Sequence, residues 1–308
     1  MGSVNNNCQL SIVKCQLISK SYGEVAALND VSFDVRKGEL FGLIGPDGAG
    51  KTTLFRILTT LIPADSGTAT VNGLDVVRDY KDIRRCVGYM PGRFSLYQDM
   101  TVEENLTFFA SVFGTTIKDN YAQIEDIYKQ IEPFKNRRAS KLSGGMKQKL
   151  ALSCALIHKP SVLFLDEPTT GVDPVSRKDF WEILRRLKEQ GITILVSTSY
   201  MDEATLCDRI ALIRDGQFLK INTPRQIISQ YNETLWTVSS DRMSKLYTDL
   251  HHMHGIKSCF AFGNTHHITV DPDTLTMNEL KNRLAGLSHT NIEIIPIEAT
   301  IEDCFMAI

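Results

Sequence analysis

Short apolar runs recur along the first two thirds of the chain, separated by segments with helical periodicity. The clearest runs are 40–44, 162–165 and 192–196. Continuous apolar runs of this length are typical of strands buried on both faces, as in a parallel sheet. A helix expected over about 175–190 supplies the crossover between the last two strands. Together these elements predict an α/β fold with a mixed or parallel sheet at its core.

Weaker patterns predict the remaining strands of this part. They are expected at 10–17, 31–35, 67–73 and 87–90, and on both sides of an Asp-Gly turn at 210–213 and 214–218. Residues 101–158 differ, because Glu, Lys, Leu and Phe recur there at helical spacing. We therefore expect a helical subdomain over about 95–158, inside a domain that spans 8–225.

After Thr223-Pro224 the pattern changes again. A helix from about 225 is followed by expected strands at 235–239, 258–262, 267–270 and 292–297, with helices at 243–252 and 276–284. This order predicts a small α+β domain of βαββαβ type over 226–308.

Composition excludes some classes of protein. The chain has 308 residues, with 34 basic and 36 acidic side chains, so it lacks the basic excess of a nucleic-acid binder. No run approaches the roughly twenty apolar residues of a membrane-spanning helix, and the first residues do not form a secretory signal. The seven cysteines are scattered, which favours buried thiols in a reducing cytosol. We expect no nucleic-acid partner.

One glycine-rich stretch carries the strongest chemical signal. It fits G-x-x-x-x-G-K-[ST], with an apolar run before it and helical spacing after it. Glycines let backbone N–H groups point at phosphate oxygens, and the helix that follows presents its positive end to the same anion. Lys51 is expected to reach the outer phosphates, and the Thr52 hydroxyl to join a Mg²⁺ shell. The bland alternative is a chance glycine-rich turn. The stretch consists of Gly45, Pro46, Asp47, Gly48, Ala49, Gly50, Lys51, Thr52 and Thr53.

A second motif places two carboxylates after an apolar strand. Asp166 and Glu167 follow the run 162–165 and precede Pro168. Buried acids are costly unless a cation or hydrogen bonds compensate. Asp166 is therefore predicted to hold Mg²⁺ through water, and Glu167 to polarise an attacking water as general base. The alternative is a strand end that merely turns into solvent.

Between these motifs lies Leu142-Ser143-Gly144-Gly145. The order of phosphate loop, L-S-G-G and D-E-P resembles the nucleotide-binding domain of ABC transporters over about residues 8–225. The resemblance implies a P-loop NTPase fold of ABC type. It also implies that two such domains sandwich two ATP molecules, each between the phosphate loop of one domain and the Ser143, Gly144 and Gly145 of the other. Tyr22 matches the aromatic residue that stacks on adenine, and 171–174 the loop that crosses the dimer interface.

Finer features look most like exporters of the drug and polysaccharide type. These are the run 93–106, the L-S-G-G segment and the C-terminal stretch 297–305. The resemblance implies a separate integral membrane permease subunit and a place in the cytoplasm, peripheral on the inner face of the cell membrane. Phe94, Leu96 and Tyr97 either line the groove that receives a cytoplasmic helix of that subunit or simply pack the subdomain core.

The chain departs from the family pattern at three positions. Gly92 stands where a glutamine touches Mg²⁺ and the attacking water, Ser199 where a histidine senses the γ-phosphate, and Met146 where glutamine is more usual. Serine donates one hydrogen bond but is shorter and carries no positive charge. The catalytic candidates are thus Glu167, Lys51 and Ser199. We expect a slow ATP site in an asymmetric pair; alternatively, Ser199 with a water does the work of histidine and Glu167 suffices.

The overall prediction is an ATPase subunit of an exporter, pairing with a second nucleotide-binding domain on the same or a different chain. A soluble ABC protein acting on ribosomes or DNA is a rival, although such proteins usually carry two nucleotide-binding domains or long coiled-coil or basic insertions, and this chain has one such domain and none of these insertions. A regulatory module that binds ATP without hydrolysing it is another, which Gly92 and Ser199 favour. The histidines and Cys259 in 251–267 are predicted to be solvated residues rather than a metal site.

Overall fold

The computed structural model describes residues 10–308. The chain divides into two compact units, Met1–Pro224 and Arg225–Ile308. The expected start of the first domain, residues 8 and 9, lies outside the described residues. Each unit is described separately below.

The first unit is built around a six-stranded sheet with strand order β10-β9-β3-β8-β7-β6. Pairing is parallel between β3 and β8, β3 and β9, β7 and β8, and β6 and β7, while β9 and β10 form an antiparallel hairpin. β3 and β7 are buried at every position, which explains their continuous apolar sequences. The strands are β3 (Leu40–Ile44), β6 (Val87–Met90), β7 (Val162–Asp166), β8 (Thr193–Thr198), β9 (Arg209–Arg214) and β10 (Gln217–Asn222).

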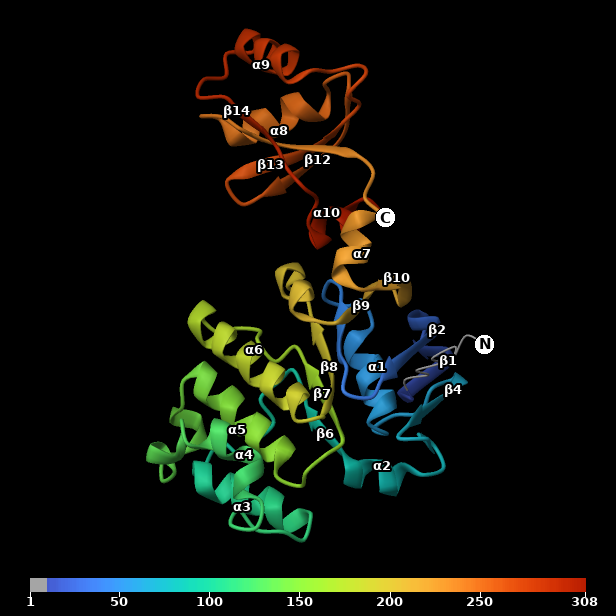
Figure 1. The fold of residues 1–308 in the computed structure, drawn as a ribbon, viewed down its shortest axis with the longest axis vertical. Coiled ribbons are helices and arrows are strands. Elements are labelled where there is room, and N and C mark those ends of the chain that lie inside the picture. Colours follow the sequence, from blue (N-terminus) through green and yellow to red (C-terminus); the bar gives the residue numbers. More distant parts are fainter. Residues whose placement is uncertain (1–9) are drawn as a thin grey trace, which may run out of the picture. The chain divides into compact units, whose positions relative to one another are not determined.

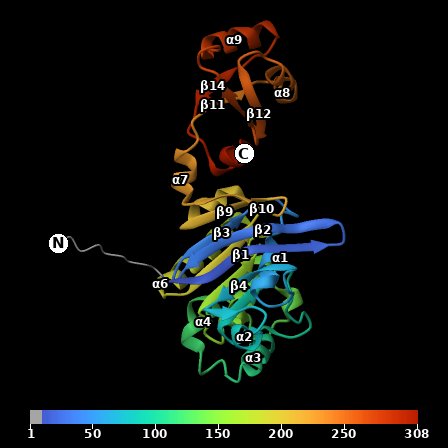
Figure 2. The same ribbon diagram turned by 90° about the vertical axis from the view of Figure 1, so that its right-hand side faces the viewer.

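A four-stranded antiparallel sheet lies in the same unit, with order β2-β1-β4-β5. It contains β1 (Ser11–Tyr22), β2 (Val25–Arg36), β4 (Ser66–Val71) and β5 (Leu74–Asp75). Figure 2 shows β1 and β2 running side by side as its two long strands. Both are longer than the apolar patterns predicted, because cross-strand pairing extends them through polar, half-exposed positions.

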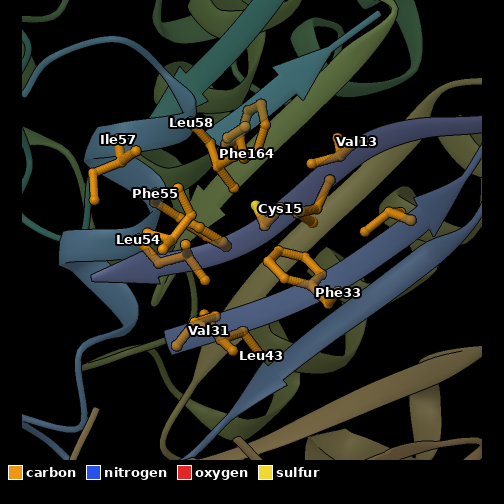
Figure 3. Close-up of a cluster of buried hydrophobic side chains, with 14 of the residues drawn as sticks. Val13, Cys15, Val31, Phe33, Leu43, Leu54, Phe55, Ile57, Leu58 and Phe164 are labelled. Carbon is orange, nitrogen blue, oxygen red and sulfur yellow. The ribbon is translucent and has the colours of Figure 1, made fainter. Parts of the chain in front are cut away.

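Helix α1 (Lys51–Leu58) follows the phosphate loop directly and packs into the core between the sheets. In Figure 3, Leu54, Phe55, Ile57 and Leu58 gather with Phe164 of β7 and with side chains of the antiparallel sheet. The rings of Phe55 and Phe164 meet edge to face, with centroids 5.6 Å apart. Because these four side chains of α1 are 0% exposed, their packing in the core holds the position of the helix and of its N-terminus.

Helices gather on one side of the six-stranded sheet in the region that was predicted to be helical. Figure 1 shows α3, α4 and α5 together there, with α6 beside them. Thr101 begins α3 with a reciprocal capping box, in which its hydroxyl accepts from the Glu104 N–H and the Glu104 carboxylate accepts from the Thr101 N–H. Besides α1, the helices of the first unit are α2 (Tyr80–Cys86), α3 (Val102–Val112), α4 (Tyr121–Tyr128), η1 (Glu132–Phe134), η2 (Ala139–Lys141), α5 (Gly144–Leu156), α6 (Pro174–Glu189) and η3 (Met201–Leu206).

The second unit has an antiparallel sheet with order β12-β13-β11-β14. Its element order from β11 to β14 is the predicted βαββαβ. Leu246, Leu250, Leu280 and Leu284 of its two crossover helices pack against the sheet and are 0% exposed. The elements are α7 (Pro224–Ser229), β11 (Thr234–Ser239), α8 (Met243–His251), β12 (Ile256–Phe262), β13 (Thr265–Val270), α9 (Met277–Gly286), β14 (Glu293–Pro296) and α10 (Ile301–Met306).

The prediction that the histidines and Cys259 of this unit are solvated is wrong in part. Cys259 is 2% exposed and belongs to the core, and His266 is 6% exposed with its Nε2 2.8 Å from the Met243 carbonyl oxygen. Both lie on strands, and their burial depends on which face of the sheet the strand register gives them.

The cysteines of the described residues carry no disulfide, and Cys8 lies outside that range. Cys86 is half-buried, and burial raises the pKa of the Cys15, Cys154 and Cys207 thiols. Within residues 10–308, no helix combines the length and the apolar character needed to cross a bilayer.

Candidate nucleotide site

The phosphate loop connects the buried strand β3 to helix α1, as its sequence predicted. Two glycines are required by the geometry. A Cβ on Gly45 would lie 2.1 Å from the Ile213 carbonyl oxygen, and Gly50 caps α1 with φ of 103° and no room beside the Ala27 carbonyl oxygen. Between them, Pro46, Asp47 and Gly48 are exposed, and nothing lies within 4 Å of the Cβ position of Gly48. The loop therefore presents exposed backbone directly before a helix N-terminus, which suits a phosphate chain.

Lys51 folds back across this loop and is 3% exposed. Its ammonium donates to the Gly45 carbonyl at 2.7 Å and to the Pro46 carbonyl at 2.9 Å. It also forms an ion pair with Glu167, with Nζ 3.0 Å from Oε1. The phosphate loop and the acidic strand end therefore meet at one ammonium group.

The two carboxylates of the D-E-P motif have different surroundings. Asp166 ends β7, is 2% exposed, and accepts a hydrogen bond from the Ser197 hydroxyl at 2.7 Å. Glu167 leaves the strand with φ of 47°, a left-handed conformation that is uncommon outside glycine. Its N–H is held by the Ser197 carbonyl at 3.1 Å and the Ser197 hydroxyl at 3.0 Å. These contacts turn the Glu167 side chain toward Lys51.

The C-terminal end of β8 lies beside this acidic pair, because Ser197 of β8 is the register partner of Asp166 of β7. Ser199 follows β8 directly and is half-buried. The Thr198 carbonyl accepts from the Gly45 N–H at 3.2 Å, so the residue before Ser199 is bonded to the start of the phosphate loop. Ser199 thus leaves the sheet beside the loop and the carboxylates.

Gly92 lies close to the same pair, just after β6. A Cβ placed on it would be 3.1 Å from the Asp166 carbonyl oxygen and 3.8 Å from the Asp166 carboxyl carbon. Next to it, burial and then the negative charge of Asp166 raise the pKa of Tyr89 to about 12, so its phenol stays protonated. The position where the family carries glutamine is therefore at the acidic cluster, and no side chain extends from it here.

The Ser143-Gly144-Gly145 segment forms the N-terminus of α5. Ser143 is the N-cap, and its hydroxyl accepts from the Met146 N–H at 3.3 Å. A Cβ on Gly145 would lie 2.7 Å from the Ser176 hydroxyl, and one on Gly144 would lie 3.6 Å from the Gly171 carbonyl. The segment therefore packs against the loop that follows the D-E-P motif and against the first turn of α6, with Ser143 and Gly144 exposed.

Tyr22 is the last residue of β1 and is 48% exposed. The turn after it contains Gly23 with φ of 61°, which returns the chain to β2. Lys20 places its ammonium 5.9 Å from the Tyr22 ring centroid. The ring is thus available at the surface for stacking.

An apolar cavity of about 440 Å³ lies between the helical region and β6. Leu96 lines it, whereas Phe94 and Tyr97 are not among its lining residues, so the groove and core alternatives for these three side chains both stay predictions. Tyr97 instead packs edge to face on Phe108, and Phe94 lies under the Lys147 ammonium. Burial lowers the pKa of His158, which also lines the cavity and is stacked on Phe113 at 3.8 Å.

Two residues of this site were missed from the sequence. Ser197 binds both carboxylate residues, and Glu203 accepts from the hydroxyls of Thr198 and Thr169. A polar pair, Ser197-Thr198, at the end of an apolar strand was the available signal. This pattern does not show which residues Ser197 and Thr198 bind, because Asp166, Glu167 and Glu203 lie on other segments of the chain.

Comparison with known proteins agrees with this geometry. The family described as ABC transporter matches residues 28–170. The probable multidrug ABC transporter ATP-binding protein YbhF of Escherichia coli K12 is 41% identical over 225 residues, which are 71% of this chain and 38% of YbhF. The chain thus matches well under half of that relative's length. The linearmycin resistance ATP-binding protein LnrL of Bacillus subtilis is 36% identical over 223 residues, 71% of each chain.

Solved structures show the same fold. An ATP-binding subunit of an ABC transporter superposes with a TM-score of 0.65 at 28% identity, covering 72% of this chain and 93% of the other. A dimeric ATP-binding cassette in a post-hydrolysis state with ADP and Pi gives 0.63 at 26% identity, covering 68% and 98%. With LnrL 36% identical over 71% of both sequences, the chain belongs to the family of ABC transporter ATP-binding proteins.

Proposed function

We propose that this chain is the ATP-binding subunit of an exporter and that it couples ATP-driven closure of two nucleotide-binding domains to movement of a separate membrane subunit. The observation that carries the proposal is the meeting of Lys51, Glu167 and the β8 end beside the phosphate loop. The names of YbhF and LnrL, a multidrug transporter and a linearmycin resistance protein, support an export role. In this proposal the transported substrate contacts the membrane subunit and not this chain.

The residues divide the work of binding. Residues 45–53 cradle the phosphates, with Lys51 turning from the Gly45 and Pro46 carbonyls to the β- and γ-phosphates, and Tyr22 stacks on the base. Thr52 and Asp166 are the groups that fit a Mg²⁺ ion, since a hydroxyl and a buried carboxylate are oxygen ligands beside the phosphate loop. When bound, the ion neutralises charge on the phosphates. Ser143, Gly144 and Gly145 serve the ATP of the second nucleotide-binding domain.

Glu167 is the proposed general base for hydrolysis. Its ion pair with Lys51 must open before the carboxylate can face a water, and nucleotide binding gives Lys51 other anions to contact. Ser199 is the proposed donor to the γ-phosphate. With a glycine at position 92 and a serine at 199, fewer groups hold the water and the γ-phosphate, so turnover at this site is expected to be slow.

The apolar cavity beside Leu96 is the proposed seat for a cytoplasmic helix of the membrane subunit. Its lining includes Phe109, Val112 and Phe113 from the helical region and Met90 from β6, so an occupant touches both parts at once. Such an amphipathic helix buries its apolar face in a groove of this kind. A contact of this kind is consistent with a position of the chain at the inner face of the cell membrane.

A second candidate function is an ATP-binding regulatory module that does not hydrolyse. Gly92 and Ser199 favour it, because they remove two groups that position the reaction. Binding and turnover measurements separate the two functions.

The test is ATP binding and hydrolysis by the purified chain, alone and after reconstitution with its membrane subunit. Lys51→Ala is expected to abolish binding, and Glu167→Gln to retain ATP while losing turnover. Glu189→Gln, at the exposed end of α6, is the matched charge control and should behave as wild type. Wild-type binding without turnover in either setting would favour the regulatory function, and absence of binding would refute both.

A further inference from the structure

Glu203 in η3 is a buried carboxylate with no assigned role. It is 2% exposed, and its Oε2 accepts hydrogen bonds from the Thr198 hydroxyl at 2.6 Å and the Thr169 hydroxyl at 3.1 Å. Both threonines are 1% exposed. A buried carboxylate is costly unless its partners are well placed, so this arrangement fixes the positions of all three groups.

The other carboxylate oxygen faces Arg177 in the first turn of α6. Arg177 Nε lies 3.3 Å from Glu203 Oε1, close enough for an ion pair but without hydrogen-bond alignment. The guanidinium also lies over the Tyr200 ring, 4.2 Å from its centroid, and donates to Asp202 at 3.1 Å. Arg177 thereby joins Glu203 to the helix that follows the interface loop.

Each partner of Glu203 belongs to a segment of the nucleotide site. The Thr198 carbonyl accepts from the Gly45 N–H, and the Thr198 hydroxyl accepts from the Tyr200 N–H at 3.0 Å. Thr198 therefore holds the residue after Ser199 as well as the start of the phosphate loop. Thr169 begins the loop 169–173, whose last residue, Asp173, caps α6. Glu203 therefore connects the Ser199 segment, the phosphate loop and the loop after Glu167.

We infer that Glu203 is a positioning residue for ATP hydrolysis, which holds Ser199 in register with the loop 169–173. It acts through Thr198 and Thr169 rather than on the nucleotide, since no contact joins it to Lys51 or Glu167 among the described residues. A domain that closes on the loop 169–173 then moves Ser199 with it. This inference rests on the proposed function for the identity of the reaction.

The test compares Glu203→Ala, Glu203→Gln and Thr198→Val in the full chain. Glu203→Gln keeps an oxygen that accepts from both threonines, so it serves as the conservative rescue. Asp202→Asn is the control, because it removes the exposed partner of Arg177 and leaves the threonines untouched. The readouts are kcat, the dissociation constant for ATP, and hydrogen exchange of the backbone amides in 169–173 and 197–200.

We expect Glu203→Ala and Thr198→Val to lower kcat about tenfold to a hundredfold with ATP affinity within about threefold of wild type. The double variant should be no worse than Glu203→Ala alone, because Glu203→Ala already breaks the link to Thr198. Glu203→Gln and Asp202→Asn should stay near wild type. Exchange should rise in both segments together in Glu203→Ala, and in neither segment in the control.

The inference fails if kcat and exchange in Glu203→Ala match wild type. It also fails if ATP affinity falls as much as kcat, because Glu203 then supports nucleotide binding or the site as a whole rather than the hydrolysis step. If the wild-type chain binds ATP but does not hydrolyse it, the inference is judged by hydrogen exchange alone: a joint rise in 169–173 and 197–200 in Glu203→Ala supports it, and no rise overturns it. If it does not bind ATP at all, the proposed function is refuted instead, whatever Glu203 does.

Discussion

Restoring the two missing side chains provides a direct test of the claim that this site is slow. Gly92→Gln and Ser199→His return the glutamine and histidine that the family pattern carries. The structure permits the first change, since Gly92 does not have a left-handed φ and its Cβ position faces the acidic cluster, 3.8 Å from the Asp166 carboxyl carbon. The closest atom, the Asp166 carbonyl oxygen at 3.1 Å, needs to move by a few tenths of an ångström.

The size of the expected gain follows from the value of positioned groups. One well-placed donor in a hydrolytic site contributes on the order of a hundredfold in kcat, which corresponds to about 3 kcal/mol of barrier. Imperfect placement on this backbone reduces that, so we expect each substitution to raise kcat about tenfold. Because both groups act on one transition state, the double variant should gain less than the product of the two.

The assay is steady-state ATP turnover by the purified chain, with ATP affinity measured separately. Gly92→Ala adds the Cβ without the amide and should leave kcat unchanged. Adding Lys51→Ala to the double variant should remove the gain. An unchanged kcat in all three restored variants, with ATP still bound, would refute the reasoning and show that Glu167 with Ser199 is sufficient or that another step limits turnover.

Four further predictions concern binding and stability. Glu167→Gln should keep ATP affinity and lose turnover, as measured by equilibrium binding beside kinetics; equal loss of both would argue against a role as general base. Phe55→Ala should lower the free energy of unfolding by about 3 to 5 kcal/mol in urea titration, because the ring is 0% exposed in the core; a cost under about 1 kcal/mol would contradict the packing. Thr101→Ala should cost about 1 kcal/mol by removing the cap of α3, whereas Thr101→Ser should cost little. Since burial holds the pKa of His158 below its ordinary value of 6.5, the unfolded chain takes up a proton there that the folded chain refuses, so stability should fall as the pH drops through about 6.5, and His158→Gln should flatten that dependence in thermal melts.

The sequence by itself determined the local parts of this protein. The phosphate loop needs only consecutive residues, because glycines, a lysine and a helix start are all within one stretch of chain. The strands β3 and β6 match their predicted bounds, and β7 matches to within one residue, since burial on both faces leaves an uninterrupted apolar run. The cap at Ser143 was likewise readable as a polar residue before a helix.

Tertiary structure alone decided which groups meet. Asp166 lies beside Ser197 because β7 and β8 pair in parallel, and Gly92 lies beside Asp166 because β6 pairs with β7. The sequence shows that these strands exist but not their order or register in the sheet. The partners of Glu203 were hidden for the same reason, since the hydroxyls it holds come from separate segments. Contacts between distant parts of the chain depend on many weak packing interactions acting together, and no single stretch of sequence contains the information on all of them.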